Sequence, residues 1–259
     1  MIAKVARILL CAFIILGLLG LPITTGNAQE VNTAEALLAR MTPAEKVGQL
    51  FLITFDGSEV LENSPIYNLI NNYHVSGVVL RADHNNFVDD STNTWQLIQT
   101  LQNINWQKSN PLDTGAPADP NTNYIPLYVG MNLVQDNNRT PQLLSGLSEY
   151  PSPMSIGATW STELAQEVGK VVGQELSALG VNLLLGPSLD VVDSKDMVAA
   201  SYVGTQSFGG DPYWVGEMGK SYIEGVHVGS QGRMSVIAQH FPGLGSVDRS
   251  PNEEVSTVQ

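Results

Sequence analysis

The order of apolar and polar residues predicts a chain that alternates buried strands with amphipathic helices. Five apolar runs are typical of strands, and they span residues 48–57, 75–83, 125–132, 181–192 and 234–241. Between these runs, apolar side chains recur at helical spacing and form four faces: Ile66, Leu69, Ile70 and Tyr73; Trp95, Ile98, Leu101 and Ile104; Leu164, Val168, Val172 and Leu176; Trp214, Met218, Tyr222 and Val226. Apolar strands separated by such helices indicate a parallel sheet covered by helices.

Start and stop residues support these helices. Thr42, Ser64 and Asp211 each precede a proline, which is typical of a capping side chain followed by the first helical turn. Glu45 stands three residues after Thr42, so we expect a capping box there. Gly180 follows the last apolar position of its helix, where a glycine commonly ends a helix.

Several predicted strands end in a polar or charged residue: Asp56, Arg81, Asn132, Asp190 and His240. In a barrel such strand ends converge on one mouth, whereas an open doubly wound sheet binds its ligand at a switch point with a Gly-rich turn. The sequence has no such turn, so the predicted fold class is α/β, a (β/α)₈ TIM-type barrel. The chain supplies about five βα units of the eight that a barrel needs. We therefore expect an incomplete barrel and a fragment of a longer protein.

Residues 1–28 have the features of a secretory signal peptide. Lys4 and Arg7 precede an apolar stretch at residues 8–21, and small residues follow it. Pro22 cuts this stretch short of the about 20 apolar residues that a membrane anchor needs. We therefore expect cleavage, no stable membrane insertion, and a protein that is secreted, either extracellular or in the cell envelope.

Removal of the signal changes the composition of the remaining domain, residues 29–259. It takes Cys11, the only cysteine, so no disulfide can form. It also takes two cations and no acid, which moves the formal charge from -13 to -15. An acidic chain without a basic run argues against a nucleic-acid partner. No metal-ligand spacing occurs, no cofactor is expected, and no feature indicates an oligomeric state.

Three ordered motifs carry a resemblance to a known family: "VNLLLGPSLDVV", "GTQSFGGDPYWVGEMG" and "VIAQHFPGLG". Together they resemble the N-terminal barrel domain of glycoside hydrolase family 3, over about Met41 to Asp248. That family includes β-N-acetylhexosaminidases and β-glucosidases. The resemblance implies hydrolysis of β-linked glucosides or N-acetylglucosaminides with retention, through an aspartate nucleophile that follows a later strand. No catalytic residue is therefore assigned in this chain, and we expect residues 29–259 alone to be inactive.

The resemblance also implies a set of sugar-binding residues, several of which differ from the residues of the family's motifs. His240 matches the family's Lys-His-Phe-Pro-Gly motif and would hydrogen-bond sugar hydroxyls, while Gln239 stands in place of the lysine. Gln206 replaces the arginine of Gly-Thr-Arg-Ser-Phe-Gly, and Met131 or Asn132 replaces a sugar-gripping aspartate. An amide keeps donors and acceptors but loses the charge. The loss of three charged positions leaves open an alternative, a non-catalytic or degenerate sugar-binding barrel.

Other candidates have a structural explanation beside the functional one. Asp190 matches a family residue, but a carboxylate that caps the next loop explains it equally well. His240 could likewise be satisfied inside its own turn. Asp56 and Arg81 are explained by an ion pair between neighbouring strand ends. The tryptophans are expected to pack on helix faces, although Trp160 could line a sugar platform.

The hexosaminidase branch of the family uses an Asp-Ser-His loop as its general acid and base. Asp248, Arg249 and Ser250 occupy that place, and none of the chain's four histidines follows them. Glu253 and Glu254 could supply a proton only if burial raised a pKa, and adjacent loop acids are usually solvated.

Overall fold

The computed structural model describes residues 33–87, 90–109, 124–133, 146–192 and 203–247. The chain divides into two compact units, Met1–Arg40 and Met41–Gln259. The described part of the first unit is helix α2 (Thr33–Arg40). The signal peptide predicted for residues 1–28 lies outside the described residues. The features below all belong to the second unit.

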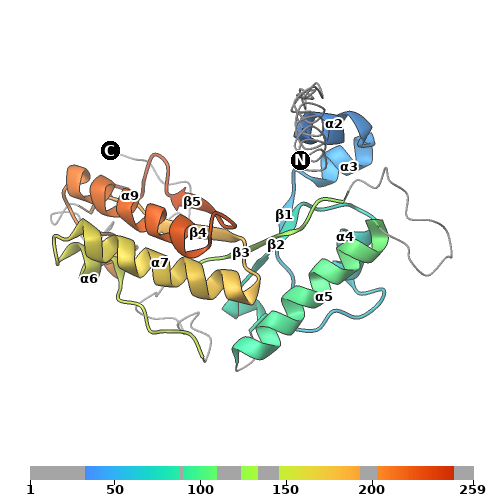
Figure 1. The fold of residues 1–259 in the computed structure, drawn as a ribbon, viewed down its shortest axis with the longest axis horizontal. Helices are drawn as coiled ribbons and strands as arrows, with labels where there is room; N and C mark the ends of the chain where they lie inside the picture. The colour runs from blue at the N-terminus through green and yellow to red at the C-terminus, as the bar shows by residue number, and fades with distance from the viewer. Residues whose placement is uncertain (1–32, 88–89, 110–123, 134–145, 193–202, 248–259) are drawn as a thin grey trace, which may run out of the picture. The chain divides into compact units, whose positions relative to one another are not determined.

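The second unit is built on one parallel sheet whose strands follow chain order (Figure 1). Its strands are β1 (Leu52–Ile53), β2 (Gly77–Leu80), β3 (Tyr128–Met131), β4 (Leu183–Ser188) and β5 (Ser235–Gln239). Each lies within one of the apolar runs, so all five predicted strands are confirmed, although each is shorter than its run. Among the described residues β5 does not pair with β1, and the barrel is therefore not closed.

Helices alternate with these strands, as the apolar pattern predicts. They are α3 (Pro43–Gly48), α4 (Pro65–Asn71), α5 (Ser91–Ser109), α6 (Pro153–Gly157), α7 (Thr162–Leu179) and α9 (Pro212–Gly229), with 3₁₀ turns η1 (Ala82–His84) and η3 (Gly204–Gln206). The capping box is present, since Thr42 accepts from the Glu45 amide and its own amide donates to the Glu45 carboxylate. Ser64 and Asp211 cap α4 and α9. Gly180 ends α7 at φ 95°, a left-handed conformation that favours glycine.

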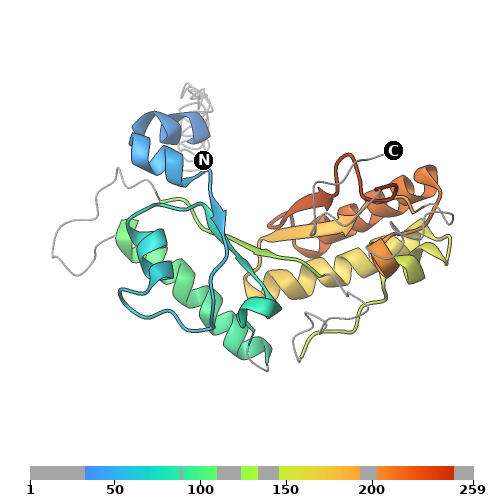
Figure 2. The ribbon, with the colours of Figure 1, turned by 180° about the vertical axis from the view of Figure 1, so that it is seen from behind.

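Helices α7 and α9 lie side by side and cover the β4 region of the sheet (Figures 1 and 2). Their backbones approach closely because glycines face the contact from both helices. A Cβ on Gly173 would lie 2.3 Å from the carbonyl oxygen of Val226, and one on Gly229 would lie 1.9 Å from that of Lys170. No side chain fits in these gaps, so the glycines fix the distance between the two helices.

The predicted apolar faces are correct in the middle of each helix and wrong at some ends. Val172 and Leu176 on α7 are buried, as are Met218, Tyr222 and Val226 on α9. In contrast, the outermost members of the faces are exposed, and these are Tyr73, Trp95, Leu164 and Trp214.

The last strand of the sheet is open to solvent. β5 pairs with β4 in parallel, with a register irregularity between Leu185 and Ser188, and it pairs with no other described strand. Its Ile237 side chain is 45% exposed, and Phe241, just beyond the strand, is 99% exposed. Apolar groups of a buried barrel strand thus lie uncovered at this edge among the described residues.

Candidate functional site

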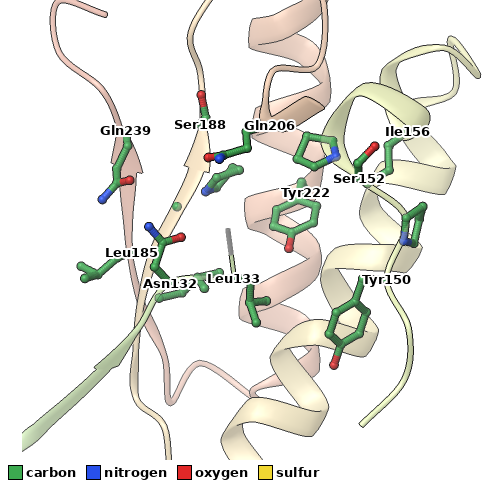
Figure 3. Close-up of a pocket in the computed structure, with 15 residues that line it drawn as sticks. Asn132, Leu133, Tyr150, Ser152, Ile156, Leu185, Ser188, Gln206, Tyr222 and Gln239 are labelled. Carbon is green, nitrogen blue, oxygen red and sulfur yellow. The ribbon is translucent and has the colours of Figure 1, made fainter. Parts of the chain in front are cut away.

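A cavity lies at the carboxyl ends of β3, β4 and β5 (Figure 3). Three of the predicted sugar-binding residues, Asn132, Gln206 and Gln239, line it. The rest of the lining is mostly apolar and comes from β4, the segment around α6, and α9: Leu133, Tyr150, Pro151, Ser152, Pro153, Ile156, Leu184, Leu185, Gly186, Pro187, Ser188 and Tyr222. A mostly apolar cavity with a few polar groups is the common form of a small-molecule site.

The parallel sheet explains why the three amides meet. Asn132 directly follows β3, and Gln239 is the last residue of β5. Gln206 is the last residue of η3, in the connection between β4 and α9. Because the carboxyl ends of parallel strands lie at one end of the sheet, residues about 30 to 110 positions apart are brought together there. Each amide presents one carbonyl acceptor and two N–H donors without net charge.

Asp190 and His240, the other two predicted site residues, bind each other. His240 Nδ1 lies 2.7 Å from Asp190 Oδ2, which also accepts from Ser188 Oγ at 2.7 Å. Asp190 Oδ1 accepts from the amide of Leu244 at 2.5 Å. Burial tends to raise the pKa of this carboxyl, but the hydrogen bonds from His240, Leu244 and Ser188 hold its pKa below the ordinary value. The carboxylate is therefore ionised near neutral pH.

The side chains of Asp190 and His240 differ in their exposure to solvent. The Asp190 side chain is 1% exposed and both its oxygens are occupied, so the carboxylate acts here as an anchor between β4 and the turn after β5. The His240 side chain is 42% exposed. Since an ionised carboxylate can only accept, Nδ1 carries the proton, and Nε2 has no hydrogen-bond partner among the described residues. The structural explanations from the sequence are therefore wrong in detail: His240 binds Asp190 after β4 and not a group of its own turn, and Asp190 caps the turn after β5 and not the loop that follows β4. His240 still presents one open nitrogen.

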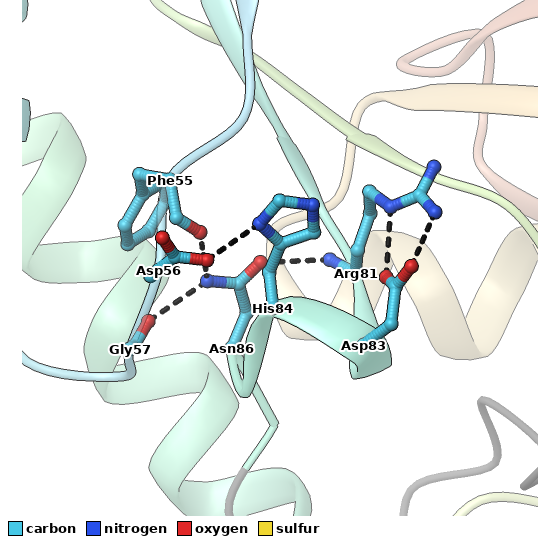
Figure 4. Close-up of polar contacts among 7 residues, drawn as sticks. All are labelled: Phe55, Asp56, Gly57, Arg81, Asp83, His84 and Asn86. Carbon is cyan, nitrogen blue, oxygen red and sulfur yellow. Dashed lines mark hydrogen bonds and ion pairs between the residues drawn. The ribbon is translucent and has the colours of Figure 1, made fainter.

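The ends of β1 and β2 carry a second polar cluster (Figure 4). Asp56 lies 2.7 Å from Nδ1 of His84, and Arg81 binds Asp83 through Nε at 2.8 Å and Nη2 at 2.5 Å. The expected ion pair between Asp56 and Arg81 is therefore wrong. A carboxylate two residues from Arg81, in the same 3₁₀ turn, is reached at a lower entropic cost than one on the neighbouring strand. The guanidinium also lowers the pKa of Asp83 to about 2.

A buried asparagine holds this cluster in place. Asn86, 1% exposed, donates from Nδ2 to the carbonyls of Phe55 and Gly57 and accepts from the amide of Arg81 through Oδ1. These bonds tie the segment after β1 to the segment after β2, as Figure 4 shows. The sequence pattern gave no signal for Asn86, because an asparagine in a polar loop is ordinary until its neighbours are known.

Two tyrosines of the cavity were not predicted as site residues. Tyr150 donates its hydroxyl to Glu175 on α7, and Ser148 binds the same carboxylate through its amide and hydroxyl. Burial, together with this carboxylate, raises the pKa of Tyr150, and burial raises that of Tyr222. Both phenols therefore stay protonated. The apolar pattern places Tyr222 on the packing face of its helix, and its burial on α9 agrees.

Several sequence candidates lie outside the described residues. These are Asp248, Arg249, Ser250, Glu253 and Glu254. Within the described ranges, no group of three His, Cys, Asp or Glu side chains is arranged to hold a metal ion. The helices described here include none with the length and apolar character needed to cross a membrane.

The family of the chain follows from its sequence over nearly the whole second unit. Residues 42–259 match the model of the glycosyl hydrolase family 3 N terminal domain. The chain therefore belongs to this family, and the resemblance seen in its motifs is confirmed. The family's N-terminal domain is a TIM-barrel-like α/β fold, in agreement with the parallel sheet and the helices between its strands.

Curated relatives are named for glycosidase activities. A β-N-acetylglucosaminidase/β-glucosidase of Cellulomonas fimi is 31% identical over 216 residues, which is 82% of this chain and 31% of that protein. A β-hexosaminidase of Thiobacillus denitrificans is 32% identical over 128 residues, 47% of this chain and 33% of that protein. The chain thus spans about a third of the length of these relatives.

Solved structures show the same fold. A family 3 β-N-acetylglucosaminidase from Paenibacillus sp. FPU-7 superposes with a TM-score of 0.68 at 26% identity, over 84% of this chain and 36% of that one. A β-N-acetylhexosaminidase from Beutenbergia cavernae gives a TM-score of 0.62 at 25% identity, over 80% of this chain and 56% of that one.

Proposed function

We propose that the protein hydrolyses O-glycosidic bonds in β-linked glucosides or N-acetylglucosaminides. The observation that carries this proposal is the cavity at the strand ends, where Asn132, Gln206 and Gln239 meet in a member of glycosyl hydrolase family 3. The names of the relatives support the same substrate class. They give no support to a non-catalytic sugar-binding barrel.

The three amides suit a sugar because each hydroxyl of a sugar both donates and accepts a hydrogen bond. Gln206, Gln239 and Asn132 can satisfy both roles, while the apolar part of the lining contacts the sugar's C–H faces. The protonated phenols of Tyr150 and Tyr222 border the same space. We assign binding and orientation to these groups. The retaining mechanism needs a nucleophile and an acid/base group, and neither role is assigned to a residue of this chain.

The test uses chromogenic aryl β-glucosides and aryl N-acetyl-β-glucosaminides with the purified whole protein, because residues 29–259 alone are expected to lack the nucleophile. We expect turnover of at least one class, and a loss of about two- to tenfold in kcat/KM for Gln206→Ala or Gln239→Ala, the range expected for one neutral hydrogen bond. Gln166→Ala is the matched control, since this exposed glutamine of α7 does not line the cavity. Absence of turnover in the wild type, with turnover gained by the double variant Gln206→Arg/Gln239→Lys, would contradict the proposal and favour a degenerate barrel.

We also propose that the protein is exported by means of residues 1–28. The support is the order of two cations, an apolar stretch and small residues in that segment. Amino-terminal sequencing of the protein recovered from outside the cytoplasm is the test. A mature chain that begins near residue 29 is expected, and a chain that retains residues 1–28 would contradict cleavage.

A further inference from the structure

Three aromatic side chains form an exposed cluster at the helix ends. Trp160 and Trp214 contact edge to face with ring centroids 5.3 Å apart, and Tyr213 contacts Trp214 at 5.5 Å. Their exposed fractions are 61% for Trp160, 66% for Tyr213 and 36% for Trp214. We call these three residues the aromatic shelf. Exposed apolar groups that touch one another commonly mark a binding surface, whereas single exposed ones do not.

The backbone around the aromatic shelf is restrained by the starts of two helices. Trp160 stands just before Ser161, the cap of α7, and has a left-handed φ of 56°, which is unfavourable for a bulky residue. On the other side, Asp211 caps α9 by accepting from the amides of Tyr213 and Trp214 at 2.9 and 3.1 Å. The three rings thus lie at the amino-terminal ends of α7 and α9, whose caps hold them in fixed positions. A preorganised surface of this kind loses little entropy when a ligand binds.

Two chain segments connect the strand-end cavity with the aromatic shelf. Ile156 lines the cavity, and four residues later the same segment reaches Trp160, whose neighbour Thr159 donates its amide to the Ile156 carbonyl. Gln206 also lines the cavity, and its segment reaches Tyr213 seven residues later. Helix α6 packs against η3, α7 and α9, so these two segments are neighbours. Both run from a cavity wall to a ring of the shelf.

The charge near the aromatic shelf selects against an anionic ligand. Glu163 and Asp211, on the first turn of α7 and at the cap of α9, are both exposed, and the chain carries a net charge of -13. Such a surface repels nucleic acid and other polyanions. Sugar rings are neutral, and their C–H faces pack on aromatic rings while their hydroxyls remain in water. The ligand that fits both the rings and the charge is an uncharged glycan.

We propose that the aromatic shelf is a second carbohydrate subsite, which holds a distal sugar of a neutral β-linked glycan whose end occupies the strand-end cavity. This inference rests on the proposed function for the occupant of the cavity. It adds that the protein prefers oligosaccharides over single sugars. Trp160 is its central residue, because it is the more exposed of the two tryptophans and contacts Trp214 edge to face.

The test measures affinity against glycan length. Thio-linked β-1,4 oligomers of glucose or N-acetylglucosamine, which resist hydrolysis, are titrated by calorimetry at one, two, four and six sugars. In the wild type we expect Kd to fall about three- to tenfold with length, the scale of one aromatic contact. Trp160→Ala should remove this gain and leave the single-sugar Kd unchanged. Trp95→Ala is the matched control, because Trp95 is 45% exposed on α5, which contributes no residue to the cavity.

The possible outcomes separate this inference from the proposed function. A Kd that does not change with length in the wild type, or the same length dependence in Trp160→Ala and Trp95→Ala, overturns the subsite. Failure of the proposed function is detected in a different experiment, because the aryl glycosides would then not be hydrolysed. If circular dichroism shows that Trp160→Ala is unfolded, Tyr213→Ala carries the same test, since its ring is 66% exposed and loses little packing. Retention of the full length dependence in Tyr213→Ala would then overturn the subsite.

Discussion

At the scale of single residues, Asp190 connects the strand ends that form the site. It accepts hydrogen bonds from Ser188, His240 and the amide of Leu244 while nearly fully buried. Asp190→Asn replaces one acceptor oxygen by a donor, so at least one partner is left unsatisfied. We expect a loss of about 1–3 kcal/mol in the free energy of unfolding, measured with urea. Asp211→Asn is the control, because asparagine caps a helix as well as aspartate does. Equal stability of the two variants would refute this account of Asp190.

The same residue predicts how stability depends on pH. The folded-state pKa of Asp190 is below its ordinary value of about 3.9, so the unfolded chain binds this proton more readily. Its contribution is therefore present above about pH 4 and is lost as the pH falls through the folded pKa. We expect the stability gap between the wild type and Asp190→Asn to be constant from pH 7 to 5 and to narrow below pH 4. Urea titrations at four pH values measure it, and a gap unchanged at pH 3 would contradict the prediction.

At the scale of elements, the contact between α7 and α9 depends on glycines. We predict that Gly173→Ala lowers the free energy of unfolding by about 1–3 kcal/mol, because its Cβ would meet the Val226 carbonyl at 2.3 Å. Gly216→Ala on α9 is the control, since a Cβ there meets nothing within 4 Å. It should gain about 0.5–1 kcal/mol from helix propensity. Thermal or urea unfolding measures both, and stabilisation by both substitutions would show that the helices can move apart at no cost.

The elements themselves could be predicted from the sequence because their signals are local. Thr42 with Glu45, Ser64 and Asp211 cap helices where the pattern placed them, since a cap requires residues only two or three positions apart. The glycine contact between α7 and α9 could not be predicted in this way. Gly173 meets a backbone more than 50 residues away, and within its own helix a glycine indicates only a weak position.

The candidate site likewise has one part that the sequence pattern predicts and another that depends on long-range contacts. Asn132 and Gln239 could be placed at one mouth because parallel strands end together, and both line the cavity. The choice of partners could not be foreseen. Arg81 binds Asp83 and Asp56 binds His84, since side-chain reach and loop geometry decide between charges that are all close by. Tyr150 lines the cavity and donates its hydroxyl to Glu175, and no local pattern encodes either contact.

At the scale of the whole molecule, the open edge of the sheet predicts how the chain behaves in solution. β5 pairs on one side among the described residues, and Ile237 and Phe241 are exposed there. Because unpaired apolar edges associate, we expect residues 29–259 to form oligomers as their concentration rises, measured by light scattering after size exclusion. Ile237→Lys should shift the chain towards monomer, since an edge charge opposes strand pairing. Val228→Lys, at an exposed position on α9 and not on a strand, is the control. An equal shift in both variants would attribute association to general hydrophobicity rather than to β5.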